Sequence, residues 1–389
     1  MNIHILYRRA LCLAFSLIIF TSLAAKAATL DDEPRIDPRD TTLTGDGPYV
    51  IYQLDGGVRV VSVSTEGAII DTTYAALPDD FTLHVVDHQG RFPFDVKLHK
   101  IERQPWHYEQ PERVFVMSDP HGKLDCVISL LQANGVIDDE YRWSFGTDHL
   151  VVIGDIFDRG WDVPQIFWLF YKLEAEAAEA GGRVSFLLGN HEPLVLGNDM
   201  RYTKPKYKML ADSIGVAYPQ LFGPDTELGY WLGTRNTMQV IGRDLYVHAG
   251  LSRKFFERHL SIPTVNEEMS RGLFYEKQAR REFSILTRFL FGNDGPVWYR
   301  GLVRDEARYD PMSADSLRLC LNSYGADRVF VGHTIFDDIS TFYDGLVIDV
   351  NVDNEINRDA RRGRAVLIEG GTLYVVGDEG KMRKLANNE

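Results

Sequence analysis

LVVIGDIFDRG, residues 150–160, is the stretch that decides the fold, because four other blocks of the chain repeat its plan. In each block an apolar run stops at Asp, Asn or His. The other four are VFVMSDPHG (114–122), VSFLLGNHE (184–192), LYVHAG (245–250) and VFVGHT (329–334). Short apolar runs bounded by turn residues are typical of buried strands, and ligands of open sheets bind at the carboxyl ends of the strands. We therefore expect the polar residues after these strands to meet.

The residues at these strand ends are the donors that divalent metal ions need. Asp119 and His121 stand two apart and can face one ion across a turn, and Asp155 is placed to bridge two ions. The candidate metal ligands are Asp119, His121, Asp155, Asn190, His248 and His333. Two ions about 3.5–4 Å apart suit phosphoryl transfer, because they lower the pKa of a shared water and neutralise phosphate oxygens. The mixed donor set suits Mn, Fe or Zn better than Mg or Ca.

Three residues in the same loops are expected to act on a substrate rather than to hold metal. Arg159 can bind two phosphate oxygens, and Asn190 is counted with it as a phosphate-binding residue. His191 is the candidate general acid for the leaving oxygen, and Asp158 is the partner that orients it. We expect Glu192 to bond to backbone near the loop rather than to react.

Two further stretches each have two interpretations. GPVWYR (295–300) is either a packed loop or the source of a second phosphate clamp, Arg300. YTKPKYK (202–208) is either a solvated turn or a lip that contacts a phosphorylated substrate. The two remaining cysteines of the mature chain, Cys126 and Cys320, are expected to be buried thiols rather than a bridge. Neither begins a Cys-x5-Arg loop, which excludes a cysteine-nucleophile phosphatase.

The N-terminus has the features of an export signal. Arg8 and Arg9 precede an apolar run over residues 11–23, and Ala25-Lys26-Ala27 offers a small-x-small cleavage site. We expect cleavage near Ala27, a periplasmic or secreted protein, and no stable membrane insertion afterwards; an uncleaved anchor is the alternative. The net charge of −14 argues against sequence-independent nucleic-acid binding, which needs a cationic surface.

The pattern along the chain predicts three parts: residues 1–27 as the signal, 28–111 as a leader with a small antiparallel β unit, and 112–389 as a catalytic domain. Residues 104–112 are expected to be a linker, and two long insertions, 193–235 and 252–312, to form the walls of a cleft. From residue 113, strands alternate with helices, which predicts a layered α/β domain. The clearest predicted helices cover 124–133, 163–180, 271–291 and 314–324.

At these motifs the chain resembles the calcineurin-like metallophosphoesterases, and within them the phosphoprotein phosphatase branch. GD-x-x-DRG and GNHE match that branch, and the GPVWYR loop and export signal resemble the bacterial Shewanella-like protein phosphatases, including the cold-active protein-tyrosine phosphatase type. The resemblance covers roughly residues 113–376. It implies a central β-sandwich flanked by helices, with one metal on Asp119, His121 and Asp155 and the second on Asp155, Asn190, His248 and His333.

The resemblance also implies an activity. We expect a phosphomonoesterase that acts on phosphorylated proteins or small phosphate esters, with phosphotyrosine favoured over phosphoserine and phosphothreonine. A phosphodiesterase or dinucleoside polyphosphate hydrolase on the same core is one alternative, and a non-catalytic metal- or phosphate-binding module is another. SDPHG at residues 118–122 departs from the usual GD-x-HG, although both ligands of that turn are kept.

Overall fold

Two six-stranded sheets form the centre of the protein in a computed structural model, which describes residues 42–353 and 365–386. The first sheet runs β17 (Met382–Lys384), β16 (Thr372–Val376), β15 (Ala365–Glu369), β7 (Arg113–Met117), β8 (His149–Ile153) and β9 (Arg183–Leu187). The second runs β13 (Ser340–Phe342), β14 (Val347–Asp349), β12 (Arg328–Val331), β11 (Asp244–Val247), β10 (Met238–Ile241) and β6 (His107–Tyr108). One buried cluster contains side chains of both sheets, including Val116 and Val151 with Tyr246 and Phe330. The predicted sandwich within an α/β fold is confirmed.

Parallel pairing brings the five motif strands to a common edge. β7, β8 and β9 pair in parallel, and so do β11, β12 and β14. All five residues of β8 are buried, which explains why LVVI lacks a polar alternation. Because parallel strands end on the same side, each motif delivers its polar residues to one edge of the sandwich.

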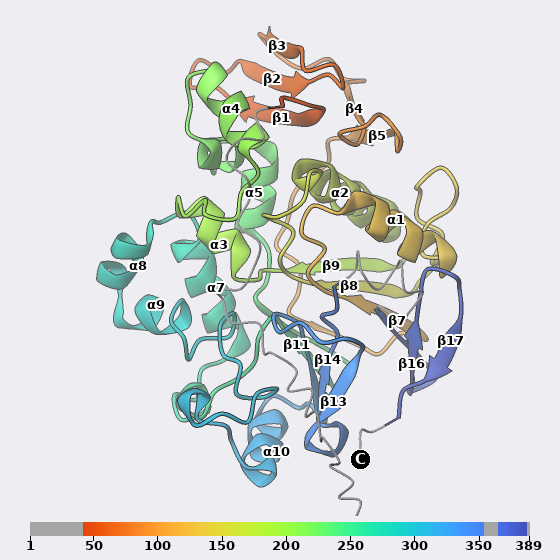
Figure 1. The fold of residues 1–389 in the computed structure, drawn as a ribbon, viewed down its shortest axis with the longest axis vertical. Helices are drawn as coiled ribbons and strands as arrows, with labels where there is room; N and C mark the ends of the chain where they lie inside the picture. Colours follow the sequence, from red (N-terminus) through yellow and green to blue (C-terminus); the bar gives the residue numbers. More distant parts are fainter. Residues whose placement is uncertain (1–41, 354–364, 387–389) are drawn as a thin grey trace, which may run out of the picture. The chain divides into compact units, whose positions relative to one another are not determined.

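Helices cover the outer face of each sheet. α1 (Leu124–Ala133) and α2 (Val163–Ala180) have the predicted bounds, and α2 lies against β9 (Figure 1). The left-handed Gly181, with φ of 83°, ends α2. On the second sheet α7 (Ile262–Gly272) packs against β10, and α10 (Ala314–Ser323) belongs to the same buried cluster. A short 3-10 turn, η3 (Tyr343–Gly345), connects β13 and β14.

The two predicted insertions contain helices and contribute no strand to either sheet. The first holds the end of α3 (His191–Leu196), then α4 (Pro205–Ser213), η1 (Tyr218–Phe222) and α5 (Glu227–Gly233). The second holds α6 (Arg253–Phe256), α7, α8 (Lys277–Phe283), α9 (Ile285–Leu290) and η2 (Ala307–Tyr309).

The single helix predicted over residues 271–291 is wrong. α7 ends at Gly272, and α8 and α9 are separated by Ser284, whose backbone is extended at φ −155° and ψ 160°. The Ser284 hydroxyl accepts the Thr287 N–H at 2.9 Å and donates to Glu268 at 2.6 Å. The amphipathic pattern continues across Ser284, but side-chain capping stops one helix and starts the next.

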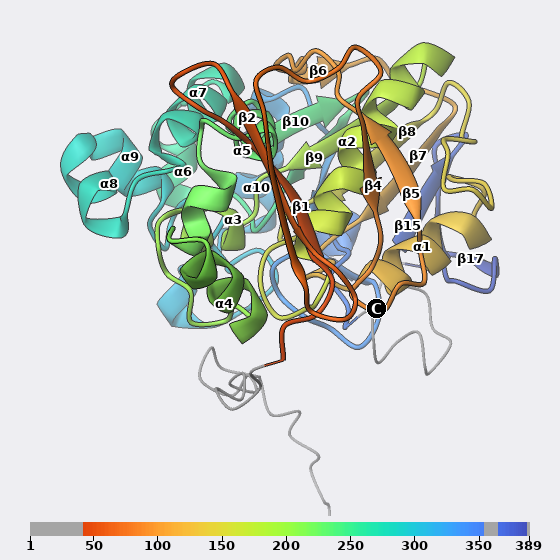
Figure 2. The same cartoon turned by 90° about the horizontal axis from the view of Figure 1, so that it is seen from above.

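The predicted N-terminal β unit is present and antiparallel, as expected. β1 (Asp46–Tyr52), β2 (Val58–Val63) and β3 (Ile69–Tyr74) form one sheet, and β4 (Thr82–Val85) pairs with β5 (Phe94–Lys97). β3 is exposed along nearly its whole length, so its sequence shows no apolar alternation. β1 and β5 pack on α2, where the Trp168 indole donates to the Pro48 carbonyl at 2.8 Å (Figure 2).

Several expectations concern segments at the margins of these units. Residues 104–112, predicted to be a linker, include β6, which pairs with β10. The predicted signal and its cleavage site at Ala27 lie outside the described residues. Within 42–353 and 365–386, no helix is long and apolar enough to cross a membrane. Cys126 and Cys320 are separate buried thiols, which confirms that prediction.

His149, at the start of β8, makes the fold sensitive to acid. Its ring is buried and lies 2.8 Å from the Ser185 hydroxyl; burial, aided by Arg183, lowers its pKa from 6.5 to about 3. The unfolded chain takes up a proton at His149 below pH 6.5, whereas the folded chain does not until about pH 3. Its contribution to stability is therefore complete above pH 6.5 and falls by about 2 kcal/mol by pH 5.

We expect His149→Gln to remove most of that pH dependence. Urea unfolding at pH 8 and pH 5 measures it, with His84→Gln on an exposed β4 position as the control. An unchanged pH dependence in His149→Gln would show that other groups cause the acid sensitivity.

Candidate functional site

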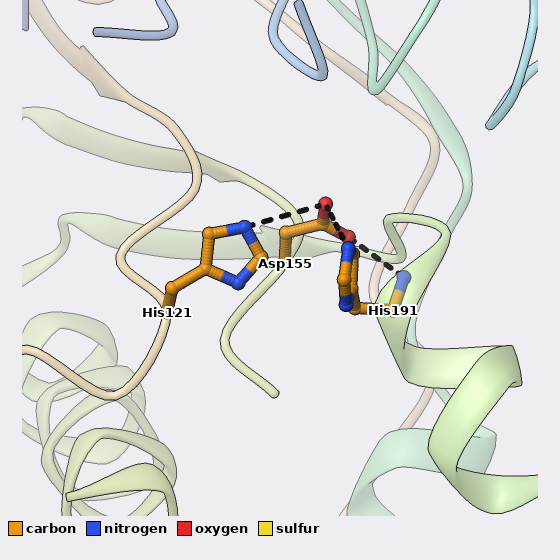
Figure 3. A group of neighbouring side chains, drawn as sticks. All are labelled: His121, Asp155 and His191. Carbon is orange, nitrogen blue, oxygen red and sulfur yellow. Dashed lines mark hydrogen bonds and ion pairs between the residues drawn. The ribbon is translucent and has the colours of Figure 1, made fainter. Parts of the chain in front are cut away.

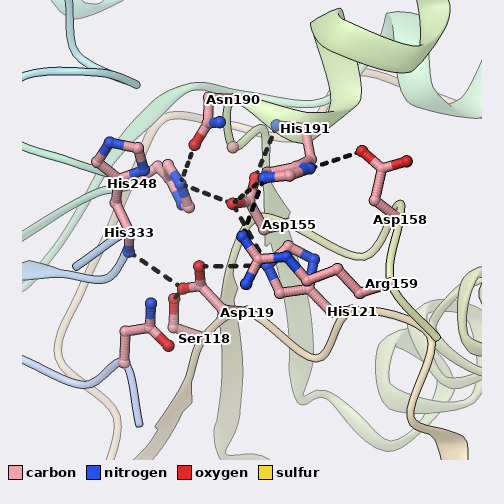
Figure 4. Close-up of polar contacts among 12 residues, drawn as sticks. Ser118, Asp119, His121, Asp155, Asp158, Arg159, Asn190, His191, His248 and His333 are labelled. Carbon is pink, nitrogen blue, oxygen red and sulfur yellow. Dashed lines mark hydrogen bonds and ion pairs between the residues drawn. The ribbon is translucent and has the colours of Figure 1, made fainter. Parts of the chain in front are cut away.

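The strand ends meet at a cluster whose backbone is unusual (Figure 4). Non-glycine residues with positive φ are uncommon, and Asp, Asn and His adopt that conformation most readily. Here Asp119 (52°), His121 (42°), Asp155 (60°) and His333 (66°) all have positive φ. Left-handed turns at the ends of rigid strands turn these side chains towards one another. Strained backbone of this kind concentrates at functional sites.

Asp155 lies at the centre of the cluster. Its Oδ2 lies 3.2 Å from His248 Nε2, and it lies 3.9 Å from Nε2 of both His121 and His191, which flank it in Figure 3. Asn190 Oδ1 lies 3.0 Å from His248 Nε2. All six predicted ligands gather here, and Asp155 faces both halves of the set, as a bridging ligand must.

The histidine rings are oriented for metal binding. His121 Nδ1 lies 2.8 Å from the Phe157 carbonyl, and His248 Nδ1 lies 2.7 Å from the Ile153 carbonyl. A carbonyl can only accept, so Nδ1 carries the proton and Nε2 is left to face the cluster. His333 Nε2 is buried, and no group in residues 42–353 or 365–386 forms a hydrogen bond with it. Such an orphaned atom fits a site built to receive an ion.

The electrostatics agree with this donor set. Burial lowers the pKa of His121 and of His333 well below the ordinary value, and nearby Arg159 and Arg300 respectively lower it further. Both rings are therefore neutral, as a ligand must be. Burial alone would raise the pKa of Asp155, but His248 and His191 hold it well below the ordinary range. Burial would lower the pKa of His248, but Asp155 and Asp119 outweigh it and raise that pKa to about 9.

His191 differs from the other rings in its partners. Its Nδ1 lies 2.6 Å from Asp158 Oδ2, and its Nε2 lies 3.5 Å from the Arg159 guanidinium. Burial would lower the pKa of His191, but Asp155 and Asp158 outweigh it and the pKa is raised. With Nε2 beside the guanidinium, the ring is placed to meet an anion, and the positive charge of Arg159 makes that side unfavourable for a metal ion.

Glu192 and two glycines hold the loops together. The fully buried Glu192 carboxylate accepts the N–H groups of Asp155, Ile156 and Gly189 at 3.0, 2.9 and 2.7 Å. The prediction that Glu192 bonds to backbone is confirmed. A Cβ on Gly189 would collide with Asp155 Oδ1, and one on Gly332 would collide with Ser118 and Asp119. The glycine before each polar residue therefore allows close approach of the loops.

The GPVWYR loop packs beside His248 and His333, two candidate ligands of the second ion. The Pro296 carbonyl accepts the Ala249 N–H at 2.9 Å, next to His248. Arg300 Nη1 donates to the His333 carbonyl at 3.1 Å, and the Trp298 ring meets the His333 ring edge-on at 5.7 Å. The packed-loop interpretation is confirmed, and the loop brings Arg300 beside the cluster.

The interpretation of the YTKPKYK segment as a solvated turn is wrong, and the Tyr202 ring of this segment lies 5.5 Å from the His191 ring. Lys206 and Tyr207 are fully buried rather than exposed. Thr203 is buried too, and its hydroxyl donates to Asp158 Oδ1 at 2.7 Å. Sequence reasoning did not find Thr203, because a threonine in a distant loop carries no signal of its partner.

Together the sandwich, the clustered carboxylate, imidazole and amide donors, and the adjoining cationic residues define a two-metal phosphoesterase. The sequence profile of the calcineurin-like phosphoesterases matches residues 112–336, more than half of the chain. The protein belongs to that family, and it is a metal-dependent phosphoesterase hydrolase.

Relatives narrow the branch. The chain is 28% identical over 273 residues to Shewanella-like protein phosphatase 2 of Arabidopsis thaliana, covering 59% of this chain and 68% of that protein. It is 26% identical to Shewanella-like protein phosphatase 1 of Plasmodium berghei, covering 57% and 61%. The solved structure of the cold-active protein-tyrosine phosphatase of a psychrophile Shewanella species has a TM-score of 0.78 at 31% identity, covering 88% and 99%. The 88% of this chain that is covered exceeds the share that residues 112–389 make up, so the likeness extends into the N-terminal part.

Proposed function

We propose that the protein is an exported phosphomonoesterase of phosphorylated proteins or small aryl phosphates, with phosphotyrosine favoured over phosphoserine and phosphothreonine. The observation that carries the proposal is the His191–Asp158 pair beside the ligand cluster. A poor leaving oxygen such as an alkoxide needs a proton, and this pair supplies one at a fixed place.

We assign the residues as follows. One ion would be held by Asp119, His121 and Asp155, and the other by Asp155, Asn190, His248 and His333. Bound metal would supply a nucleophilic hydroxide near neutral pH and charge for the phosphate oxygens. Arg159 binds two of those oxygens through its guanidinium, with Asn190 and Arg300 beside them. His191 gives the proton on Nε2 to the leaving oxygen, while Asp158 holds Nδ1.

The preference for phosphotyrosine has two supports. The relative whose structure is solved is named a protein-tyrosine phosphatase. Aromatic rings also flank the cluster, because Tyr202 lies 5.5 Å from His191 and Trp298 lies 5.7 Å from His333, measured between ring centroids. A phenyl leaving group would find stacking partners there. The metals are proposed to be Mn, Fe or Zn, from the donor types, and export from the N-terminal sequence.

A phosphopeptide panel on protein of measured metal content tests this function. We expect metal-dependent turnover, fastest on phosphotyrosine peptides, and faster turnover of an aryl phosphomonoester than of the diester of the same alcohol. Preference for the diester would favour the phosphodiesterase alternative. No turnover with both metal positions filled would favour a binding module.

A further inference from the structure

The loop before α4 contacts Asp158, which belongs to the residue pair proposed to protonate the leaving group. Asp158 is buried, and its carboxylate makes two hydrogen bonds with side chains, one at each oxygen. Asp158 Oδ2 accepts a hydrogen bond from His191 Nδ1 at 2.6 Å, which is drawn in Figure 4. Asp158 Oδ1 accepts one from the Thr203 hydroxyl at 2.7 Å. The Thr203 hydroxyl therefore fixes the rotation of the carboxylate that holds the His191 ring.

Hydrogen bonds also join the loop that carries Thr203 to the loop that carries Asp158. The Tyr202 carbonyl accepts the Arg159 N–H at 3.0 Å. The Tyr207 hydroxyl accepts the Val163 N–H at 3.1 Å and donates to the Gly160 carbonyl at 3.3 Å. These three hydrogen bonds, all to residues that follow Asp158, keep the Thr203 loop in register with the Asp158 carboxylate.

The N-terminal β unit holds the same loop from the other side. Lys206, in the first turn of α4, is fully buried and donates from Nζ to the Gly45 carbonyl at 2.7 Å. Asp46 Oδ1 lies 3.9 Å from the same ammonium. A buried ammonium is stable only where such partners remain in place. The β unit therefore anchors Lys206, and through it the loop that carries Thr203.

We propose that Thr203 is a positioning residue for the proton donor, and that the N-terminal β unit serves the reaction by anchoring its loop through Lys206. The inference rests on the proposed role of His191. Among the described residues the Thr203 hydroxyl bonds to Asp158 and to no candidate metal ligand, so we expect its effect to pass through Asp158 and His191. The proposal therefore predicts that removing the Thr203 hydroxyl lowers kcat more for a substrate whose leaving oxygen needs a proton.

The test compares Thr203→Val, which keeps the shape and removes the hydroxyl, with Thr203→Ser, which keeps the hydroxyl. For Thr203→Val we expect kcat to fall about tenfold on a phosphoserine peptide and less than about twofold on 4-nitrophenyl phosphate, which needs little protonation. KM and metal content should stay near the wild-type values, and Thr203→Ser should recover most of the lost kcat.

A double-mutant cycle with His191→Ala separates positioning from general support of the fold. If Thr203 acts through His191, adding Thr203→Val to His191→Ala costs nothing further in kcat. Equal losses on both substrates, full additivity in the cycle, or a Thr203→Ser variant as slow as Thr203→Val would each overturn the positioning role. Wild-type turnover in the same assays tests the proposed function separately, because its absence would overturn that function as well.

To test the anchor, Lys206→Met should give the same leaving-group-dependent loss as Thr203→Val, and the two changes together should cost no more than either alone. Matched Lys208→Met, at a partly buried position whose Nζ donates to the Met200 carbonyl at 3.0 Å, is the control. Lys206→Met losing activity equally on both substrates, or not at all, would overturn the part assigned to the β unit. If Lys206→Met does not fold, Asp46→Asn, which removes only the charge beside the same ammonium, takes its place; a loss equal on both substrates, or no loss, would overturn the part assigned to the β unit.

Discussion

Asp155→Asn is expected to empty or weaken both metal positions and to lower kcat by about a thousandfold or more. Asp155 faces both halves of the cluster, 3.2 Å from His248 and 3.9 Å from His121. The amide has the same shape but no charge, and its nitrogen cannot ligate a cation. The negative charge of Asp155 also offsets the repulsion between two cations at short distance, and the substitution removes that charge. Metal content per chain and kcat on an aryl phosphate measure the effect.

The matched control is Asp148→Asn. Asp148 is also buried, beside the start of β8, where its carboxylate accepts from Arg113 at 2.8 and 2.7 Å. That variant should lose stability but keep its metal. Full metal content with normal turnover in Asp155→Asn would refute the bridging role.

His191→Ala is expected to lower kcat by about a hundredfold or more on alkyl phosphates and by about tenfold or less on aryl phosphates. An alkoxide is a poor leaving group and needs the proton held on Nε2, whereas a phenolate leaves without one. The raised pKa of His191, caused by Asp155 and Asp158 in spite of burial, keeps that proton available. Rates on a series of phosphates that differ in leaving-group pKa measure the dependence.

Metal content distinguishes the two roles that the His191 position allows. His191 Nε2 lies as far from Asp155 as His121 Nε2 does, 3.9 Å. A proton donor can be removed without loss of metal, whereas a ligand cannot. Loss of one ion per chain from His191→Ala, with equal losses on all leaving groups, would make it a ligand.

The sequence predicts the buried strands and their ends well, because both depend on local features. A continuous apolar run such as LVVI is buried on both faces, and the polar residue after it lies in a turn. That reasoning located all six candidate ligands, Arg159 and the His191–Asp158 pair. It also predicted that Glu192 bonds to backbone, since a glutamate in a tight loop has nearby N–H groups to accept.

Features that depend on distant partners were not predictable. Thr203 lies 45 residues from Asp158, and its contact exists only because α4 returns to the active-site loop. Lys206 was expected in solvent, but Gly45, 161 residues away, gives its ammonium a buried acceptor. Ser284 divides a helix that periodicity alone would continue. In each case the outcome is decided by a hydrogen bond that no local pattern records.

The positive φ values at Asp119, Asp155 and His333 restrict how this centre can change. Asp, Asn and His tolerate that conformation, whereas branched or bulky side chains pay a strain of about 1–3 kcal/mol. Exchange among those few residue types is therefore the main route open at these positions. Another metal preference is therefore reached more easily by substituting the residues around the ligands than by substituting the ligands themselves. Moving the centre to another scaffold would require the strand ends to travel with it.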